Sequence, residues 1–386
     1  MTVRARALLL AVALGVRLAA VLGADREVAD VLRYRKVADH VLDVSVNPYT
    51  APRLYPYPPL WVWVEAGAGW LSRRTGASFA VLVKLPVVAA DLGIVWWLAA
   101  WSSRRGGGTR PAWVYALHPV AILVGGFHGQ FEAAALLFVL LAVSSWWQAR
   151  PTRSALFLSA AVGLKSFPVL LLPVLLAQPG QAARDRLRYA ALVLGPVLLL
   201  LLPYAIADAG ALRRELLAYG GVADFGWIGL TRGARWLAGG ALPRSEAAHW
   251  SGHVLAAKVL FLAAYGAFLA ALVRGRLGFD LPRACLSVLL AFLVFYGATS
   301  AQYLLWVVPL GALLGGRAFA VYSAAATVAL VAFYAFLAPG VLWPPPGPAW
   351  ADRRLVGVVW VAGVAAVLAS SALWLLRLNR RPAEAS

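Results

Sequence analysis

Cysteine, methionine and acidic side chains are all scarce in this chain of 386 residues. It has one cysteine, one methionine, and 16 acidic against 35 basic residues. The single cysteine, Cys285, excludes an internal disulfide and fits no metal-site spacing. Charged residues make up only 13% of the chain, whereas soluble domains are about a quarter charged. The composition therefore excludes an ordinary water-soluble domain.

Hydrophobic residues make up 62% of the chain and gather in long runs. Run after run supplies the ~20 apolar residues that a membrane helix needs. We expect an all-α polytopic membrane protein with about twelve membrane helices, two of them short, and both chain ends inside. The expected spans are 5–24, 79–101, 112–127, 131–147, a pair of half-length helices in 154–178, 189–207, 253–273, 284–299, 302–316, 318–338 and 355–376.

The chain is expected to form a single membrane domain over 1–386, because the spans leave no room for a separate soluble domain. Residues 1–210 would be a catalytic-type module with the outer loop 25–78. Residues 211–386 would supply the C-terminal helices and the outer loop 208–252. Such long outer loops favour chemistry or recognition at that surface.

The net charge of +19 does not indicate nucleic-acid binding. The basic residues form short clusters between apolar runs, as cytoplasmic loops of membrane proteins do. One segment, 154–178, has two interpretations. It is either one tilted span with Lys165 in mid-bilayer, or a hairpin broken around Lys165 to Pro168. The arginines of 184–188 favour the hairpin.

Two charges fall near the middle of the first two spans. A lone charge there costs at least ~2.5–3.5 kcal/mol. We therefore expect Arg17 and Asp91 to lie close together and to pair, as structure rather than chemistry.

The first outer loop has three parts. Residues 27–44 have apolar side chains at helical spacing and predict an amphipathic helix on the membrane surface. Residues 46–61, "VNPYTAPRLYPYPPLW", lack a helical period, and their prolines break any strand, so they predict a shaped loop. Residues 58–72 are apolar but short for a crossing and contain Glu65. We expect a helix packed at the outer surface.

Four motifs in this order carry a family resemblance. Asp30, followed by Tyr34, "NPY" at 47–49 and "YPYPPL" at 55–60, resembles the first outer loop of GT-C glycosyltransferases. It looks most like the bacterial polyprenyl-phosphate-mannose-dependent mannosyltransferases of the glycosyltransferase 87 family. It is also similar to the catalytic subunit of GPI mannosyltransferase. The later motifs are "ALHPVAILVGGFHGQFE" at 116–132, "GLKSFPVLLLP" at 163–173 and "TSAQYLLWVVPL" at 299–310. Departures are His118 in place of Asn, Glu132 where Asp is commoner, and the lack of a D-x-D pair in the first loop.

The resemblance implies an enzyme of the bacterial plasma membrane with its active site on the outer side. It would transfer a sugar, mannose with arabinose or glucose as alternatives, from a polyprenyl phosphate to a hydroxyl of a lipid-linked or glycan acceptor. The displacement would be inverting and metal-independent, without a cofactor, in a monomer. Asp30 would be the base, ahead of Asp25, Glu27, Asp39 and Asp43, and Glu132 would assist it. The resemblance assigns the donor phosphate to Lys165, Arg53 and His128, and substrate binding to Tyr34, Tyr55, Tyr57, Gln130, Gln302 and Tyr303.

Plainer interpretations stand beside these. Asp30 can be a solvated carboxylate paired with Arg33 on a helix face. Glu132 can be a favourable charge at a helix start, and Lys165 can snorkel to the surface. The chain could also be a secondary transporter or flippase for a lipid or glycan, or a non-catalytic partner subunit. A transporter predicts interrupted helices in matching halves, and only the segment around Lys165 has that pattern.

Overall fold

The structure is a computed structural model that describes residues 3–24, 28–278, 280–337, 342 and 352–379. Every element longer than a single bridge in these ranges is helical, and two isolated β-bridges join Val222 to Glu246 and Phe225 to Thr299. The expectation of an all-α chain is confirmed.

Six helices within the described ranges are long and apolar enough to cross a membrane. They are α1 (Val3–Gly23), α4 (Phe79–Arg104), α10 (Ala183–Leu212), α12 (Ser251–Val273), α15 (Arg317–Leu337) and α16 (Arg353–Asn379). On α10 and α12 large apolar side chains point away from the protein: Leu199, Ile206 and Leu262 are 68%, 78% and 62% exposed. Such surfaces suit hydrocarbon rather than water, so the chain is a membrane-embedded protein.

The remaining helices are shorter. They are α2 (Ala29–Asp43), η1 (Pro48–Thr50), α3 (Leu60–Thr75), α5 (Arg110–Ala116), α6 (Pro119–Ala121), η2 (Ile122–Phe127), α7 (Glu132–Trp147), α8 (Pro151–Leu164), η3 (Phe167–Leu171), α9 (Leu172–Leu176), η4 (Arg213–Leu217), α11 (Gly226–Leu237), η5 (Ala247–Trp250), α13 (Leu281–Phe295), η6 (Ala301–Leu305) and α14 (Val308–Leu314).

Two expected spans are divided in the structure. Segment 112–127 falls into α5, α6 and η2, and segment 302–316 into η6 and α14. Pro119 accounts for the end of α5, because a proline disfavours a helical conformation in the residue before it and cannot donate a backbone hydrogen bond. Pro309 lies in the first turn of α14, where a proline is tolerated, and does not explain the break after η6. The count of twelve membrane helices therefore stays a prediction.

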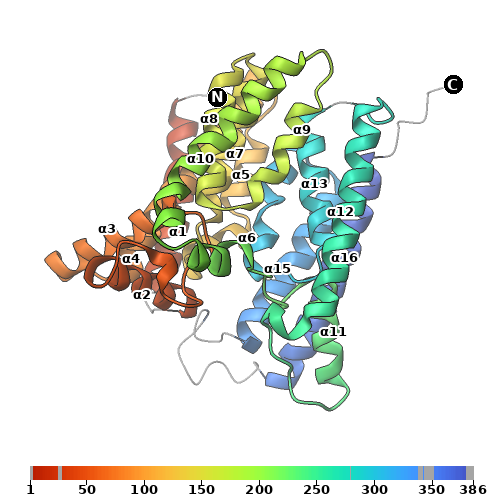
Figure 1. The fold of residues 1–386 in the computed structure, drawn as a ribbon. Helices are drawn as coiled ribbons and strands as arrows, with labels where there is room; N and C mark the ends of the chain where they lie inside the picture. Colours follow the sequence, from red (N-terminus) through yellow and green to blue (C-terminus); the bar gives the residue numbers. More distant parts are fainter. Residues whose placement is uncertain (1–2, 25–27, 279, 338–341, 343–351, 380–386) are drawn as a thin grey trace. The chain divides into compact units, whose positions relative to one another are not determined.

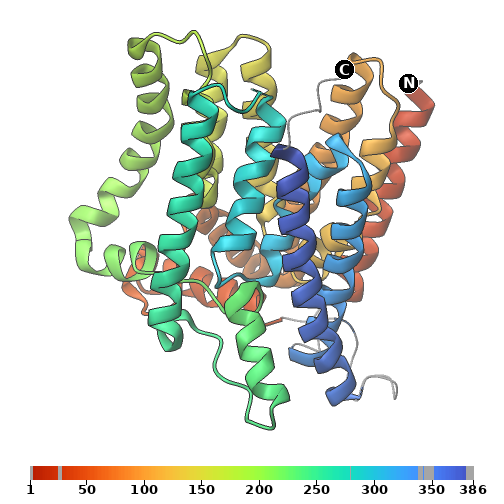
Figure 2. The same cartoon turned by 90° about the vertical axis from the view of Figure 1, so that its right-hand side faces the viewer.

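The chain contacts separate two compact units. The first comprises Met1–Leu117, Ala121–Leu172 and Gly180–Tyr219; the second comprises His118–Val120, Pro173–Pro179 and Gly220–Ser386. In the first unit α8 packs between α7 and α10, α2 packs on α3, and α1 packs on α4 (Figure 1). In the second unit α15 and α16 run side by side (Figure 2).

The first loop folds as its sequence indicates. Within the predicted segment 27–44, Ala29–Asp43 forms the amphipathic α2, whose buried face carries Val31, Tyr34, Val37, Ala38 and Val41. Residues 58–72 lie largely in α3. The proline-rich segment between them packs Tyr49 and Tyr55 against Ala211 and Leu212 in one apolar cluster. The loop is therefore anchored to the end of α10.

The expected pair of charges within the spans is confirmed. Arg17 Nε lies 3.2 Å from Asp91 Oδ2, and both side chains are buried. Arg17 also donates to the carbonyl of Ala116 at 2.7 Å, and the Tyr115 hydroxyl donates to Asp91 at 2.5 Å. The pair joins α1, α4 and α5 in the first unit.

Breaking this pair should destabilise the protein more than removing it. Arg17→Met leaves Asp91 buried without its cation, which costs about 3–5 kcal/mol for a buried pair. Arg17→Met should lower the melting temperature in detergent, and adding Asp91→Asn should recover at least half of the loss. The exposed Arg150→Met is the control. Strictly additive effects of the two substitutions would contradict the pairing.

Candidate functional site

Asp30 lies in the first turn of α2, near the helix start. A carboxylate is favoured there by the helix dipole. Its side chain is 22% exposed, so the carboxylate is partly accessible. The next residue, Val31, is fully buried and fixes the orientation of the helix.

A tight turn after η2 supplies the facing side chains. The amide of His128 donates to the carbonyl of Leu123 at 2.9 Å, and the amide of Gln130 donates to that of Val124 at 3.0 Å. Gly129 between them has φ of +80°. A Cβ at Gly129 would lie 2.9 Å from Lys84 Cε and 3.1 Å from Val31 Cγ2. Only glycine combines this backbone conformation with such close packing.

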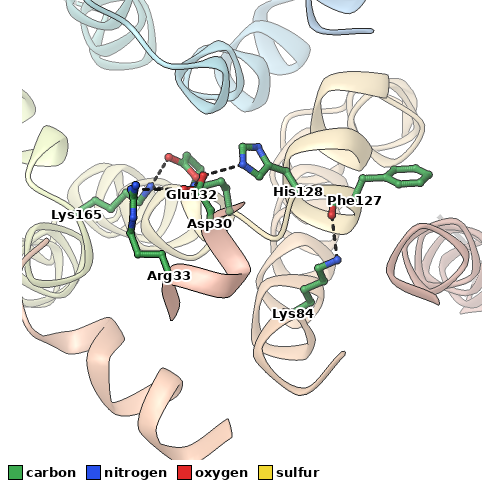
Figure 3. A network of polar contacts seen from close by, with 8 residues as sticks. Asp30, Arg33, Lys84, Phe127, His128, Glu132 and Lys165 are labelled. Carbon is green, nitrogen blue, oxygen red and sulfur yellow. Dashed lines mark hydrogen bonds and ion pairs between the residues drawn. The ribbon is translucent and has the colours of Figure 1, made fainter. Parts of the chain in front are cut away.

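The turn aims two side chains at one oxygen of Asp30. His128 Nε2 lies 2.7 Å from Asp30 Oδ2, and the Gln130 amide donates to the same oxygen at 2.5 Å. Arg33 Nη1 approaches the other oxygen at 3.6 Å (Figure 3). Asp30 is therefore held by α2 itself and by a turn about a hundred residues away in sequence.

These neighbours set the acidity of Asp30. Burial alone would raise the pKa of its carboxyl group. The hydrogen bond and charge of His128, the charge of Arg33 and the hydrogen bond of Gln130 outweigh burial and hold that pKa well below its usual range. Asp30 is consequently ionised at every physiological pH.

A second charged pair adjoins the first. Helix α8 ends at Leu164, and Lys165 has extended φ and ψ before η3 begins at Phe167. This confirms the predicted break. Lys165 Nζ donates to Oε1 of Glu132, and Glu132 is the first residue of α7. Lys165 Nζ also donates to Gln130 Oε1 at 3.3 Å. Gln130 thus connects Asp30 with Lys165, and the polar chain runs His128, Asp30, Gln130, Lys165, Glu132.

Aromatic rings enclose the buried end of this chain. Lys165 Nζ lies 4.2 Å from the Phe131 ring centroid and 4.9 Å from that of Tyr57. Phe131 stacks on Trp61 at 4.3 Å and meets Tyr34 edge-on at 6.0 Å. Tyr34 is fully buried. The rings stabilise the ammonium group and exclude water from the Lys165–Glu132 pair.

The other predicted loop residues have different surroundings. The buried Tyr55 donates its hydroxyl to the Pro58 carbonyl at 3.0 Å, which shapes the loop. Tyr49 does the same to the carbonyl of Tyr57 at 2.8 Å. Arg53 is exposed and has φ of +59°, in the left-handed region that non-glycine residues seldom adopt.

Other candidates of the sequence lie elsewhere. Asp39 and Asp43 both bind Arg73, at 2.6 Å each, on an exposed part of α2. Asp25 and Glu27 fall outside the described residues. Gln302 and Tyr303 belong to η6 in the second unit, where Gln302 is buried and Tyr303 stacks on Trp306 at 4.2 Å.

Sequence reasoning missed Lys84, whose side chain borders the turn at Gly129. The sequence did carry a signal, because a lysine inside an apolar span is itself a reason to expect a functional site. It also treated Arg33 only as a helix-face partner of Asp30. In the structure Arg33 is 46% exposed at the edge of the network and is its most accessible cation.

Among the described residues, no group of three or more His, Cys, Asp or Glu side chains could hold a metal ion. The arrangement instead presents one ionised, partly exposed carboxylate. Within the network the carboxylates of Asp30 and Glu132 balance the cationic side chains of Arg33 and Lys165, with His128 as an additional hydrogen-bonding group. Such a site can accept a proton, orient a hydroxyl group and bind an anion at its edge.

Comparison with protein-family models and with curated proteins finds no match for this chain. The functional argument therefore depends on the residues and their geometry.

Glu65 on α3 is a buried acid beside this site. It is fully buried, and neither carboxyl oxygen has a hydrogen-bond partner among the described residues. Burial raises the pKa of Glu65 well above its usual value. The group is therefore protonated in the folded protein at pH values where the unfolded chain would have it ionised.

The raised pKa of Glu65 makes stability depend on pH. Stability from this group is fully present below the pKa of the unfolded chain and is lost as pH rises toward the folded-state pKa. The melting temperature should therefore fall as pH rises above the ordinary glutamate pKa of 4.5. Glu65→Gln, which mimics the protonated acid, should flatten the dependence, whereas the exposed Glu246→Gln should not. An unchanged slope in Glu65→Gln would contradict the assignment.

Proposed function

We propose that this chain is a GT-C-type glycosyltransferase that uses a polyprenyl-phosphate sugar. The sugar is mannose, transferred to a hydroxyl of a lipid-linked or glycan acceptor at the outer face of the plasma membrane. One observation carries the proposal: three motifs that are far apart in sequence contribute to one network. Asp30 comes from the first, His128, Gln130 and Glu132 from the second, and Lys165 from the third.

The reaction assigns a task to Asp30. The acceptor oxygen forms a bond to the anomeric carbon, the bond from that carbon to the phosphate oxygen breaks, and polyprenyl phosphate leaves. The acceptor proton passes to Asp30. A carboxylate with a lowered pKa is a weak base, and this suits a late transfer. The attacking oxygen becomes strongly acidic once it is bonded to an oxocarbenium-like centre.

The departing phosphate needs positive charge. Lys165 and Arg33 are the lysine and arginine of the network, while Arg53 and His128 are the further candidates on the loop and the turn. The side chain of Arg33 is partly exposed, whereas that of Lys165 is buried and already paired with Glu132. We propose that Lys165 keeps Gln130 and Glu132 in place and adds its field to the phosphate site, with Arg33 meeting the phosphate at the entrance.

The proposal includes a GT-C fold with twelve membrane helices, a monomeric state and no metal or cofactor requirement. Tyr34 and Tyr57 remain proposed substrate-site residues. For Gln302 and Tyr303, which belong to the second unit, substrate binding stays a prediction from the sequence resemblance. Tyr55 is proposed to shape the loop that carries Arg53.

A transporter or flippase is the second candidate. The helix interruption at Lys165 supports it, because broken helices with buried charge mark transport sites. The two classes differ in a simple requirement. An enzyme turns over labelled polyprenyl-phosphate-mannose in detergent with a panel of lipid acceptors, whereas a transporter needs a sealed compartment.

Asp30→Asn keeps the shape of the side chain and removes the proton acceptor. We expect sugar transfer to fall by ~10²–10⁴-fold, while the melting temperature and donor-lipid binding stay near those of the wild type. Asp39→Asn is the matched control, because Asp39 lies on the same helix but binds Arg73. If Asp30→Asn keeps its activity and Glu132→Gln loses it, the base is Glu132.

Lys165 can be tested apart from Glu132. Lys165→Met strands the buried carboxylate of Glu132, so it should lower both melting temperature and turnover. Adding Glu132→Gln should restore the melting temperature but leave donor binding and turnover low, because the positive charge is still missing. Turnover restored together with stability would show that Lys165 has only a structural role.

A further inference from the structure

Lys84 is a fully buried lysine in the second turn of α4, one of the six candidate membrane spans. Its ammonium group donates to the carbonyl of Ala24 at 2.9 Å. It also donates to the carbonyl of Phe127 at 3.0 Å, the contact drawn in Figure 3. Burying an ammonium group among apolar helices is costly. The positions of these two carbonyl groups in the fold indicate the structural role of Lys84.

The first acceptor is at the end of α1, where helix carbonyls lack partners within the helix and favour a cation. The second acceptor is the carbonyl of Phe127, the last residue of η2, directly before His128. Lys84 therefore ties the end of α1 to the start of the turn that carries His128 and Gln130.

The aliphatic part of the Lys84 side chain packs against the same turn, at Gly129. Its Cε and Cγ would lie 2.9 and 3.2 Å from a Cβ at Gly129, and Val31 closes the other side at 3.1 Å. Val31 directly follows Asp30. The turn is thus fixed between Lys84 and the helix that presents the carboxylate.

We propose that Lys84 is a positioning residue. It fixes the turn at residues 127–130 so that His128 and Gln130 both meet Asp30 Oδ2. The geometric claim concerns the folded chain alone. Its effect on sugar transfer rests on the proposed function.

Hydrogen exchange measures the geometric claim without any substrate. The amides of His128 and Gln130 are protected by bonds to Leu123 and Val124. In Lys84→Met, exchange in the peptide 122–131 should be at least about tenfold faster than in the wild type. If Lys84→Met does not fold, Gly129→Ala should give the same result, because its added methyl group would clash with Lys84 and Val31.

Arg232→Met is the matched control. Arg232 is also a buried cation, bonded to the carbonyl of Pro243 at 2.6 Å, but it belongs to the second unit. It should leave exchange in 122–131 unchanged. Unchanged exchange there in a folded Lys84→Met protein, or in Gly129→Ala where Lys84→Met does not fold, would overturn the proposal.

Kinetics then separate positioning from general stability. Lys84→Met should lower kcat by about tenfold in the wild-type background, but by less than about twofold where His128→Ala and Gln130→Ala have already removed both donors. An equal loss in both backgrounds would overturn the positioning role. If the wild type transfers no sugar, the proposed function fails, and the exchange result still decides whether Lys84 holds the turn.

Discussion

A charge that is buried among apolar helices must be neutralised or hydrogen-bonded, and this constraint organises the first unit. Arg17 has Asp91, Lys165 has Glu132, and Lys84 has two backbone carbonyls. Each of these contacts joins elements that are distant in sequence. These contacts therefore fix the positions of the helices relative to one another and also satisfy the buried charges. The helices that they fix carry the polar network around Asp30.

The same constraint explains the character of the site. The Lys165–Glu132 pair is enclosed by Phe131 and Tyr57, while the Asp30 end of the network remains partly exposed. Donors already point at Asp30, so no reorganisation is needed to keep it ionised. A preorganised carboxylate beside accessible positive charge is an arrangement that suits a reaction in which a proton arrives and a phosphate departs.

Sequence patterns predicted the features of the fold that depend on local sequence rules. The amphipathic α2, the helix α3, the break at Lys165 and the Arg17–Asp91 pair follow from periodicity, proline chemistry and the cost of buried charge. The meeting of Asp30 with His128 and Gln130 could not be derived in this way. It depends on the left-handed Gly129 and on the π-helical turn before it, which no spacing rule encodes. The complete burial of Glu65 likewise depends on how α2 packs on α3.

The central claim is that the network around Asp30 is where sugar transfer occurs. A structure of the Asp30→Asn protein with bound polyprenyl-phosphate-mannose, determined by electron cryomicroscopy, tests it most directly. The account predicts the sugar beside residue 30, with the anomeric carbon within reach of a hydroxyl hydrogen-bonded to that side chain, and the phosphate beside Arg33 or Lys165. A donor lipid bound away from residues 30, 128–132 and 165 would contradict it.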